Sequence, residues 1–344
     1  MCETNEEGEI VCEEPLLSVS IAACNSEAYL ERCLDSCLGF EGLLDVIIVD
    51  DGSIDSTAEI ADAYVETHPK IFRVIHKENG HYGSTVNASL PMARGKFYRL
   101  LDSDDWFNRE SLCEWLKVLS ESEADAVCTA SLRIMEKSGC RITMDPWPNV
   151  ESGEHDLENL DVNEVPGPGI SNLAYRTDFL RKMKLSLLEH CNYVDEELRA
   201  VPWCRVRTVR VDHLPVYCVV KERDGQNTSL VGIRKSAFDK GKMLFHIIDQ
   251  GDFGELGART HAQTMALRVV ADDVAGGCYS NMLLLDTTRE TRKKIIDFDR
   301  RLKEELPEIY ALSGRTSRTL RALRASSFLL YSPLAHRWQR KWRA

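Results

Sequence analysis

Twice in this chain, a short apolar segment runs directly into a group of carboxylates. The carboxylates that follow residues 97–101 and 46–49 are Asp102, Asp104 and Asp105 in the first case and Asp50 and Asp51 in the second. Short apolar runs of this kind predict buried strands. In open sheets built from alternating strands and helices, ligands bind at the carboxyl ends of the strands. We therefore expect two strands of one sheet to aim at least four acidic groups at one crevice.

Carboxylates this close to one another repel, and a bound cation would offset the repulsion. At ~4 Å and an effective dielectric constant of about 20, two like charges repel by roughly 4 kcal/mol. Residues two apart in a strand point to the same side, so Asp102 and Asp104 can face one site while Ser103 turns away. Hard divalent ions such as Mg²⁺ or Mn²⁺ bind carboxylate oxygens together with substrate phosphates. The spacing favours a metal site, although Asp and Ser are also common in turns and helix caps.

The first 135 residues alternate between apolar and amphipathic segments. Strands are expected at residues 17–23, 46–49, 72–75, 96–101 and 126–134, with helical patterns between most of them. This alternation predicts an α/β fold, a mostly parallel sheet flanked by helices on both faces. Residues 79–83 are expected to form a flexible loop. Beyond residue 135 the regular alternation of strand and helix patterns ends, and residues 233–310 show a mainly helical pattern.

Composition argues against several classes of function. The net charge of -12 argues against a general nucleic-acid binder, which presents a broad basic field. No run approaches the ~20 apolar residues of a membrane span. Residues 1–14 hold six Glu and no Lys or Arg, unlike a signal peptide, and are expected to form a disordered acidic leader. These features predict a cytoplasmic protein.

Several motifs follow one another in the order found in a known enzyme family. They are Ser18–Leu30 (SVSIAACNSEAYL), Val49–Ser53 (VDDGS), residues 79–98, the acidic cluster after residue 101, and Asn192–Glu197 (NYVDEE). As an ordered set they resemble a family 2 glycosyltransferase with the Rossmann-like GT-A fold, of a bacterial type that makes surface polysaccharides. The resemblance covers roughly residues 15–232. It implies a GT-A domain there, followed by a helical extension over residues 233–344.

The resemblance implies a role for each matched residue on the donor side. Ala23 should help to cradle the nucleotide, and Asp51, with Asp50 beside it, should bind the base or the ribose. Asp102 and Asp104 match the family's Asp-x-Asp motif, so they should hold Mg²⁺ or Mn²⁺ against the donor. Of the two, Asp104 is expected to contact the metal directly. The donor is expected to be a nucleotide sugar, with a UDP-sugar favoured.

On the acceptor side, the resemblance makes Asp195 the general base that takes the proton from the acceptor hydroxyl. One such base is sufficient if the reaction inverts the anomeric carbon. The alternative for Asp195 is a helix N-cap, and Glu196 is then the next candidate for the base. Arg223 either reaches the diphosphate or lies on a surface loop. Val86 stands where many members carry Arg, which puts one phosphate contact in doubt.

The sequence leaves two other functions to be weighed. A sugar nucleotidyltransferase also uses an α/β sheet with acidic metal sites, but it normally carries a Gly-rich basic loop that residues 20–35 lack. A non-catalytic, transferase-like binding module would be expected to have lost carboxylates, and all the expected ones are present. For a transferase, the acceptor is expected to be a glycan or a lipid-linked molecule.

The C-terminal residues are strongly basic. Residues 315–344 contain eight Arg or Lys and no Asp or Glu. On a helix, Leu320, Leu323 and Leu330 fall opposite the Arg side chains, and Pro333 is expected to end that helix. Basic amphipathic segments bind anionic membranes, so we hypothesise that this tail docks the protein on the inner face of the membrane. The alternative is a surface helix whose Arg side chains pair with the acidic catalytic domain.

Overall fold

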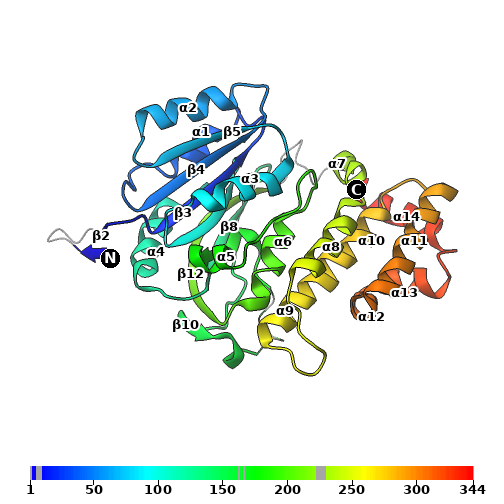
Figure 1. Ribbon diagram of the computed structural model, residues 1–344. Coiled ribbons are helices and arrows are strands. Elements are labelled where there is room, and N and C mark those ends of the chain that lie inside the picture. The colour runs from blue at the N-terminus through cyan, green and yellow to red at the C-terminus, as the bar shows by residue number, and fades with distance from the viewer. Residues whose placement is uncertain are drawn as a thin grey trace. The chain divides into compact units, whose positions relative to one another are not determined.

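The computed structural model describes residues 2–4, 10–161, 163, 165, 167–221 and 230–343, which divide into two units (Figure 1). Unit 1 comprises Met1–His190 and Arg205–Arg223, and unit 2 comprises Cys191–Cys204 and Asp224–Ala344. The sequence suggested a boundary between residues 232 and 233. Packing instead assigns the short segment Cys191–Cys204, which contains Asp195, to the helical unit.

A ten-stranded sheet forms the centre of unit 1, and eight of its strands follow the order β10-β12-β8-β11-β6-β3-β4-β5. The strands are β3 (Leu17–Ala23), β4 (Leu44–Asp51), β5 (Phe72–Lys77), β6 (Phe97–Asp102), β7 (Trp106–Phe107), β8 (Ala126–Met135), β9 (Arg141–Met144), β10 (Gly153–Asp156), β11 (Leu173–Arg176) and β12 (Thr208–Lys221). β3, β4, β5 and β6 pair in parallel, as do β8 and β12. β11 runs antiparallel between β6 and β8. The mostly parallel sheet confirms the predicted α/β class.

The alternation of side chains along β3 explains how the sheet is covered. Val19 and Ile21 point into the main apolar core, where they meet α1 (Leu30–Asp35), α2 (Thr57–Thr67) and α4 (Arg109–Glu121). Ser20 points to the other face, where its hydroxyl donates to Ser89 Oγ at 2.7 Å, at the end of α3 (His81–Ser89). Because side chains alternate along a strand, one seven-residue strand contacts helices on both faces.

Unit 2 is built from helices, as the sequence predicted for the C-terminal region. They are α6 (Asp195–Ala200), α7 (Leu230–Lys235), α8 (Asp239–Gln250), α9 (His261–Val269), the π-helix η5 (Val270–Ala275), α10 (Gly276–Met282), α11 (Arg289–Glu305), α12 (Pro307–Thr316), α13 (Arg318–Ala325) and α14 (Tyr331–Arg343). None of the helices in the described part of the chain combines the length and the apolar character needed to cross a bilayer.

The predicted disordered leader contains ordered strands. β1 (Cys2–Thr4) and β2 (Ile10–Cys12) pair antiparallel, while Met1 and residues 5–9 lie outside the described residues. The prediction rested on the acidic composition of residues 1–14. Two short strands can satisfy each other's backbone hydrogen bonds without a large apolar face, although an isolated pair of this kind is marginal in water.

The basic tail also differs from its prediction. Its helical part is divided in two, because α13 ends at Ala325 and Leu330 lies in the turn that follows. Pro333 does not end a helix but is the third residue of α14. Proline is compatible with the first turn of a helix, where backbone N–H groups have no intrahelical acceptor.

Candidate active site

Four parallel strands of unit 1 end at one edge of the sheet. The register of β3 and β4 places Ala23 beside Asp50, and β6, on the other side of β3, places Asp102 beside the residue before Ala23. β5 continues this edge beyond Asp50 and Asp51. The structure therefore brings Ala23, Asp50, Asp51 and Asp102 to the same carboxyl edge, where the sequence predicted them.

Asp51 is held firmly in this edge. It is only 3% exposed, and its Oδ1 accepts hydrogen bonds from Lys77 Nζ at 2.8 Å and Gly80 N at 2.9 Å. Ser84 Oγ donates to the same oxygen at 3.2 Å, and Asn79 Nδ2 donates to the backbone carbonyl of Asp51 at 2.9 Å. These contacts fix the orientation of a carboxylate at the predicted nucleotide site.

The segment expected to be a flexible loop is the start of a helix. α3 begins at His81, and Gly80 is its N-cap residue. The prediction was wrong because Asp51 gives this segment partners that the local sequence does not reveal. The turn after Asp51 also depends on glycine, since Gly52 has a φ of 71° and a Cβ there would lie 2.9 Å from Asn79 N. Only glycine adopts that conformation without strain.

Asp50 belongs to a second hydrogen-bonded group beside Asp51. Ser53 N donates to its Oδ1 at 3.0 Å, and His76 Nδ1 contacts its Oδ2 at 2.9 Å. Burial acts to raise the pKa of Asp50, but the hydrogen bonds from Ser53 and His76 hold it below its usual value. Hydrogen bonding to Asp50 in turn raises the pKa of His76, which also contacts Asp62 at 3.1 Å. His76 thus supports the Asp50 carboxylate.

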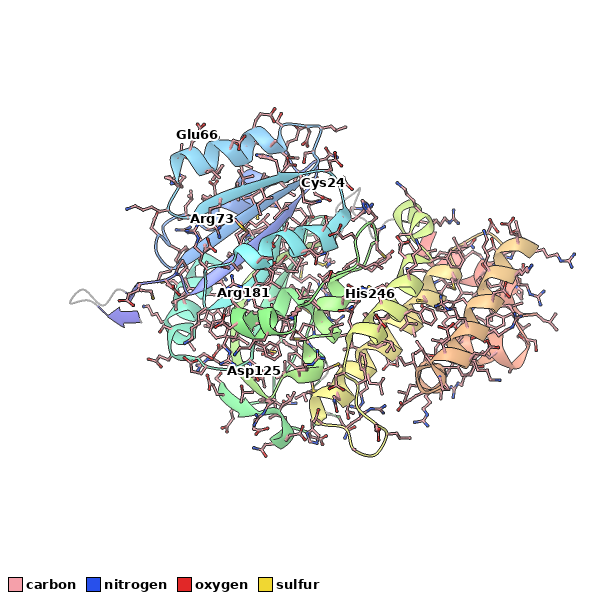
Figure 2. All side chains as sticks on the ribbon, in the orientation of Figure 1. Cys24, Glu66, Arg73, Asp125, Arg181 and His246 are labelled. Carbon is pink, nitrogen blue, oxygen red and sulfur yellow. The ribbon has the colours of Figure 1, made fainter. Side chains whose placement is uncertain are left out.

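An acidic residue near the other end of β4 has a structural role. Asp45 accepts bonds from Arg73 Nη2 at 2.6 Å and from Ser18 Oγ at 2.6 Å. Arg94 N donates to it at 3.0 Å. Figure 2 labels Arg73, and it also labels Cys24, which directly follows the carboxyl end of β3. The two ends of β4 both bury an acidic residue. At Asp45 donors engage both carboxylate oxygens, whereas the three donors to the Asp51 carboxylate described above all bind its Oδ1.

The third acidic group lies in the turn after β6. Asp102, Asp104 and Asp105 present carboxylate oxygens that all lie within 4.8 Å of one another. Tyr82 Oη donates to Asp102 Oδ1 at 3.0 Å, and Val220 N donates to Asp105 Oδ1 at 2.9 Å. Asp105 stands in the same acidic run as the other two, but the sequence gave no reason to assign it a role. Its burial and its contact with β12 come from the fold.

The electrostatics of this cluster fit a bound cation. Burial, followed by the nearby Asp104 carboxylate, raises the pKa of Asp102 to about 6. Burial together with the charge of Asp102 raises the pKa of Asp105 to about 7. A divalent ion would offset this mutual repulsion, and a donor set made of oxygens alone suits Mg²⁺ or Mn²⁺. The residues present therefore match the metal that the sequence predicted.

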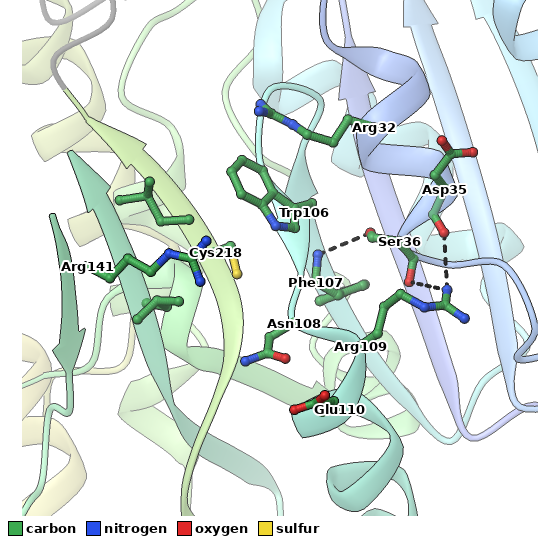
Figure 3. Close-up of a pocket in the computed structure, with 12 residues that line it drawn as sticks. Arg32, Asp35, Ser36, Trp106, Phe107, Asn108, Arg109, Glu110, Arg141 and Cys218 are labelled. Carbon is green, nitrogen blue, oxygen red and sulfur yellow. Dashed lines mark hydrogen bonds between the residues drawn. The ribbon is translucent and has the colours of Figure 1, made fainter. Parts of the chain in front are cut away.

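A pocket of about 570 Å³ opens next to the acidic turn (Figure 3). Trp106 lines it, and the Arg32 guanidinium lies 3.8 Å from the centre of that ring. Arg32 Nη2 also donates to the backbone carbonyl of Asp104 at 3.0 Å. The sequence analysis assigned no role to Arg32, which connects α1 to the backbone of the acidic turn.

Asp195 lies in unit 2, at the start of α6. Val194 is the N-cap residue, so Asp195 is the first residue of the helix and not its cap. Tyr193 before it has a φ of 67°, a conformation that non-glycine residues seldom adopt. The first two residues of α8 hold this turn, because Asn192 Nδ2 donates to Asp239 Oδ2 at 2.9 Å and Lys240 Nζ lies 4.9 Å from the centre of the Tyr193 ring.

The two glutamates after Asp195 are occupied by other partners. Glu196 pairs with Arg199 and lies 3.9 Å from Lys240 Nζ. Glu197 is 1% exposed and accepts from His246 Nδ1 at 2.9 Å; Figure 2 labels His246 on α8. Burial, with Asp195 adding to it, raises the pKa of Glu196 despite the opposing charge of Arg199. Glu196, the alternative base, is thus committed to an internal ion pair, whereas Asp195 is half-buried.

The ion pair of Arg199 continues into the π-helix η5. Arg199 Nη2 lies 3.1 Å from Asp273 Oδ2, and Lys240 Nζ donates to the backbone carbonyl of Asp273 at 3.4 Å. π-helical turns inside longer helices occur frequently at functional sites. Here the turn presents both a carboxylate and a carbonyl to the cations that surround Glu196.

Comparison with known protein families gives a match over the part of the chain that carries the strand-end carboxylates. Residues 18–183, which contain the strand-end carboxylates, match glycosyl transferase family 2. This segment, residues 18–183, belongs to glycosyl transferase family 2. The family match ends before residue 191, so it does not include Asp195.

Solved structures show the same fold over most of the chain. The crystal structure of S. aureus TarS residues 1–349 in complex with UDP has a TM-score of 0.67 and 19% sequence identity, covering 95% of this chain and 92% of the TarS chain. A second crystal structure of TarS contains UDP-GlcNAc and also has a TM-score of 0.67. This similarity confirms the GT-A fold with a helical C-terminal region.

Sequence relatives are bacterial proteins. The EpsH protein of Bacillus subtilis is 31% identical over 186 residues, or 52% of this chain and 53% of EpsH. A poly(ribitol-phosphate) beta-glucosyltransferase of Bacillus spizizenii is 23% identical over 227 residues, or 64% of this chain and 35% of that enzyme. The aligned region therefore spans about half of the first family member and about a third of the second.

Two positions, Val86 and Arg223, were considered for contacts with the donor phosphates, and the structure describes the first of them. Val86 is 1% exposed, so the position where many members of the family carry Arg belongs here to the buried side of α3. Arg223 lies outside the described residues. The buried, apolar Val86 side chain offers no donor to a phosphate.

Proposed function

We propose that this protein is a metal-dependent, inverting glycosyltransferase that moves a sugar from a nucleoside diphosphate to an acceptor hydroxyl. The observation that carries the proposal is the single edge of unit 1, where the ordered carboxylates Asp50 and Asp51 stand beside a cluster of three carboxylates. Family membership and the GT-A fold support the same reaction class.

The donor site is proposed to occupy the ends of β3 and β4. Asp51 is positioned to accept hydrogen bonds from the base or ribose of a nucleotide, since its carboxylate is already oriented by Lys77 and Gly80. Ala23 is proposed to help cradle the nucleotide through its backbone at the end of β3, because its methyl group is buried in the apolar core. A UDP-sugar is the proposed donor, supported by the UDP-GlcNAc complex of TarS.

The metal site is proposed to consist of Asp102 and Asp104, with Asp105 behind them. Mg²⁺ or Mn²⁺ held there would neutralise charge on the leaving diphosphate as a Lewis acid. A mannosyltransferase from Pyrobaculum calidifontis, solved in complex with GDP-Man and Mn²⁺, has a TM-score of 0.51 to this chain at 14% identity. Tyr82 and Arg32 orient the acidic turn, because Tyr82 Oη donates to the Asp102 carboxylate and Arg32 Nη2 donates to the backbone carbonyl of Asp104.

Asp195 is proposed to act as the general base. In the transfer step the acceptor oxygen forms a bond to the anomeric carbon, and its proton passes to the carboxylate. The bond from the anomeric carbon to the diphosphate breaks, and the electron pair leaves with the diphosphate. A single displacement of this kind inverts the anomeric carbon. Asp195 suits the role better than Glu196, because Glu196 is buried whereas Asp195 is only half-buried and so more accessible to an acceptor.

The acceptor is proposed to be a glycan or a lipid-linked precursor of a cell-surface polymer. The name of the Bacillus spizizenii relative indicates a polymer acceptor for that enzyme. A cytoplasmic location remains a prediction from the sequence.

A donor screen tests the proposal. UDP-, GDP- and dTDP-sugars are incubated with the full-length protein, with and without Mn²⁺, and the released nucleoside diphosphate is measured. We expect release from a UDP-sugar that depends on the metal, and the anomeric configuration of the product, determined by NMR, should be inverted. Release of pyrophosphate from UTP and a sugar phosphate would instead identify a nucleotidyltransferase. Nucleotide binding with no turnover of any sugar, across a range of acceptors, would identify a non-catalytic module.

A further inference from the structure

Two leucines face solvent in the turn between α13 and α14. Leu329 is 70% exposed and Leu330 is 45% exposed, whereas Phe328 beside them is buried. The turn is ordered, since Phe328 N donates to Leu323 O at 2.7 Å and Leu330 N approaches Ser326 Oγ at 3.3 Å. The chain thus holds two adjacent apolar side chains in water on a defined backbone. We call Leu329 and Leu330 the leucine tip.

The helices on both sides of the leucine tip expose only cationic charge. Arg318 and Arg321 lie on the exposed face of α13, and Arg337 and Arg340 lie on the exposed face of α14. At 1.5 Å per residue, Arg321 is roughly 6 Å from the end of α13 and Arg337 roughly 9 Å from the start of α14. These distances are comparable to the Debye length of about 8 Å at physiological salt. The cations nearest the leucine tip can therefore act together with it on a charged surface.

A third element adds to this positive field. Arg292 Nη2, in the first turns of α11, donates to the backbone carbonyl of Ser327 at 3.4 Å, which places α11 against the turn. Arg289 and Lys293 are exposed on the same part of α11. Its nearby acid, Glu290, pairs with Lys294 at 2.9 Å. Asp286, just before α11, is a second exposed acid, and its backbone carbonyl accepts from Tyr331 Oη at 3.0 Å. Cations nevertheless outnumber acids around the leucine tip, although the protein as a whole is acidic.

The apolar face of the tail is used inside unit 2 and is not available to a partner. Leu320 and Leu323 are buried, and Tyr331 Oη donates to the Met282 carbonyl at 2.8 Å. Arg324 is also internal, with its Nε 2.8 Å from Asp299 Oδ1. Arg324 therefore pairs inside unit 2, and not with the catalytic domain that the alternative named. The parts of the tail that face solvent are the leucine tip and the exposed Arg side chains of α13 and α14.

We propose that the leucine tip and the Arg residues of α13 and α14 dock the protein on an anionic lipid bilayer. Leu329 and Leu330 insert at the boundary between headgroups and acyl chains, and the Arg side chains contact lipid phosphates. A bilayer is the occupant that matches both features, since it offers an apolar layer directly beneath a layer of negative charge. This inference does not depend on the proposed transfer reaction.

Vesicle co-sedimentation of the full-length protein tests the proposal. One set of vesicles contains equal parts of phosphatidylglycerol and phosphatidylcholine, and the other contains phosphatidylcholine alone. We expect binding to the anionic vesicles only, weakened by added salt. Leu329→Ser with Leu330→Ser should lower the partition coefficient about tenfold or more, because two apolar side chains no longer insert. Arg321→Ser with Arg337→Ser should lower it about 25-fold, at about fivefold for each cation.

Leu256→Ser is the matched control. Leu256 is 82% exposed in the loop between α8 and α9, but its neighbour is the acidic Glu255. The control should partition like the unchanged protein, and all variants should keep its melting temperature. The proposal is overturned if the unchanged protein fails to bind anionic vesicles at low salt. It is equally overturned if the leucine-tip variant binds normally, or if Leu256→Ser reduces binding as much as that variant does.

Discussion

The two units position their key carboxylates by different means. In unit 1, Asp50, Asp51 and Asp102 belong to the last residues of parallel strands, and the register of the sheet aligns them. In unit 2, Asp195 opens a helix of six residues after a turn in which Tyr193 has a positive φ. The turn before Asp195 is held by side chains of α8, through Asp239 and Lys240, whereas strand pairing aligns the carboxylates of unit 1.

This difference has a consequence for mutation. A strand-end carboxylate keeps its place when a neighbouring side chain changes, because the backbone pairing remains. The turn before Asp195 is held by Asp239 and Lys240, which are remote in sequence, so each of them can shift the carboxylate. A misplacement of about 1 Å can lower a rate by about 10²-fold. We therefore expect remote substitutions to matter more in unit 2 than in unit 1.

The largest effect is expected at the acidic cluster. Asp104→Asn should lower transfer by about 10³-fold or more, because metal stabilisation of the leaving group is worth several kcal/mol. The metal-dependent part of the affinity for UDP should disappear as well, which titration calorimetry with and without Mn²⁺ measures. Asp178→Asn, at an exposed position of unit 1, is the control and should change neither quantity. Unchanged metal-dependent binding in Asp104→Asn would remove this residue from the metal site.

The next effect is expected at the base. Asp195→Asn keeps the shape of the side chain but cannot accept a proton, so kcat should fall by ~10²–10⁴-fold. The affinity for UDP should stay the same, because the donor site lies on the strand ends of unit 1. Steady-state kinetics together with UDP titration separate the two quantities. If Glu196→Gln caused this loss while Asp195→Asn did not, Glu196 would be the base.

A smaller effect is expected from the support of the Asp195 turn. Lys240→Met removes the cation next to the Tyr193 ring and Glu196, so kcat should fall by about tenfold while the affinity for UDP is kept. Lys240→Arg should restore most of the rate. Lys235→Met, at an exposed position of α7, is the control. Full activity of Lys240→Met would show that the turn holds its shape without this cation and would weaken the contrast between the units.

The smallest effect is expected from the pair of Asp50 and His76. The pKa of His76 is raised in the folded protein, so its contribution to stability is lost as pH rises through that value, above 6.5. The pKa of Asp50 is lowered, so its contribution is lost as pH falls through that value, below 3.8. His76→Gln should therefore lower the melting temperature most at a pH below 6.5 and progressively less as the pH rises through the raised pKa of His76. Because His76 is partly exposed, the change should stay within about 1 kcal/mol. A pH-independent loss would mean that the pair is not ionic.

Much of the unit 1 site could be predicted from the sequence, because strand ends are local features. Five strands were expected near their observed positions, and Asp50, Asp51 and Asp102 were placed on one edge before any contact was known. The antiparallel strand β11 was not expected, since it inserts between β6 and β8 from a distant segment. The helix start at His81 and the support of the acidic turn by Arg32 were also missed, because their partners are remote in sequence.

The sequence by itself determined the class of fold, the carboxyl edge and its acidic character, since periodicity and residue type act over a few neighbouring positions. The tertiary structure decided which carboxylates are available. It engages both carboxylate oxygens of Asp45 through Arg73 and Ser18, pairs Glu196 with Arg199, and buries Asp105 among like charges. It also buries the apolar face of the basic tail and exposes Leu329 and Leu330 instead. Burial and ion pairing depend on segments that meet only in the folded chain, so no local pattern could reveal them.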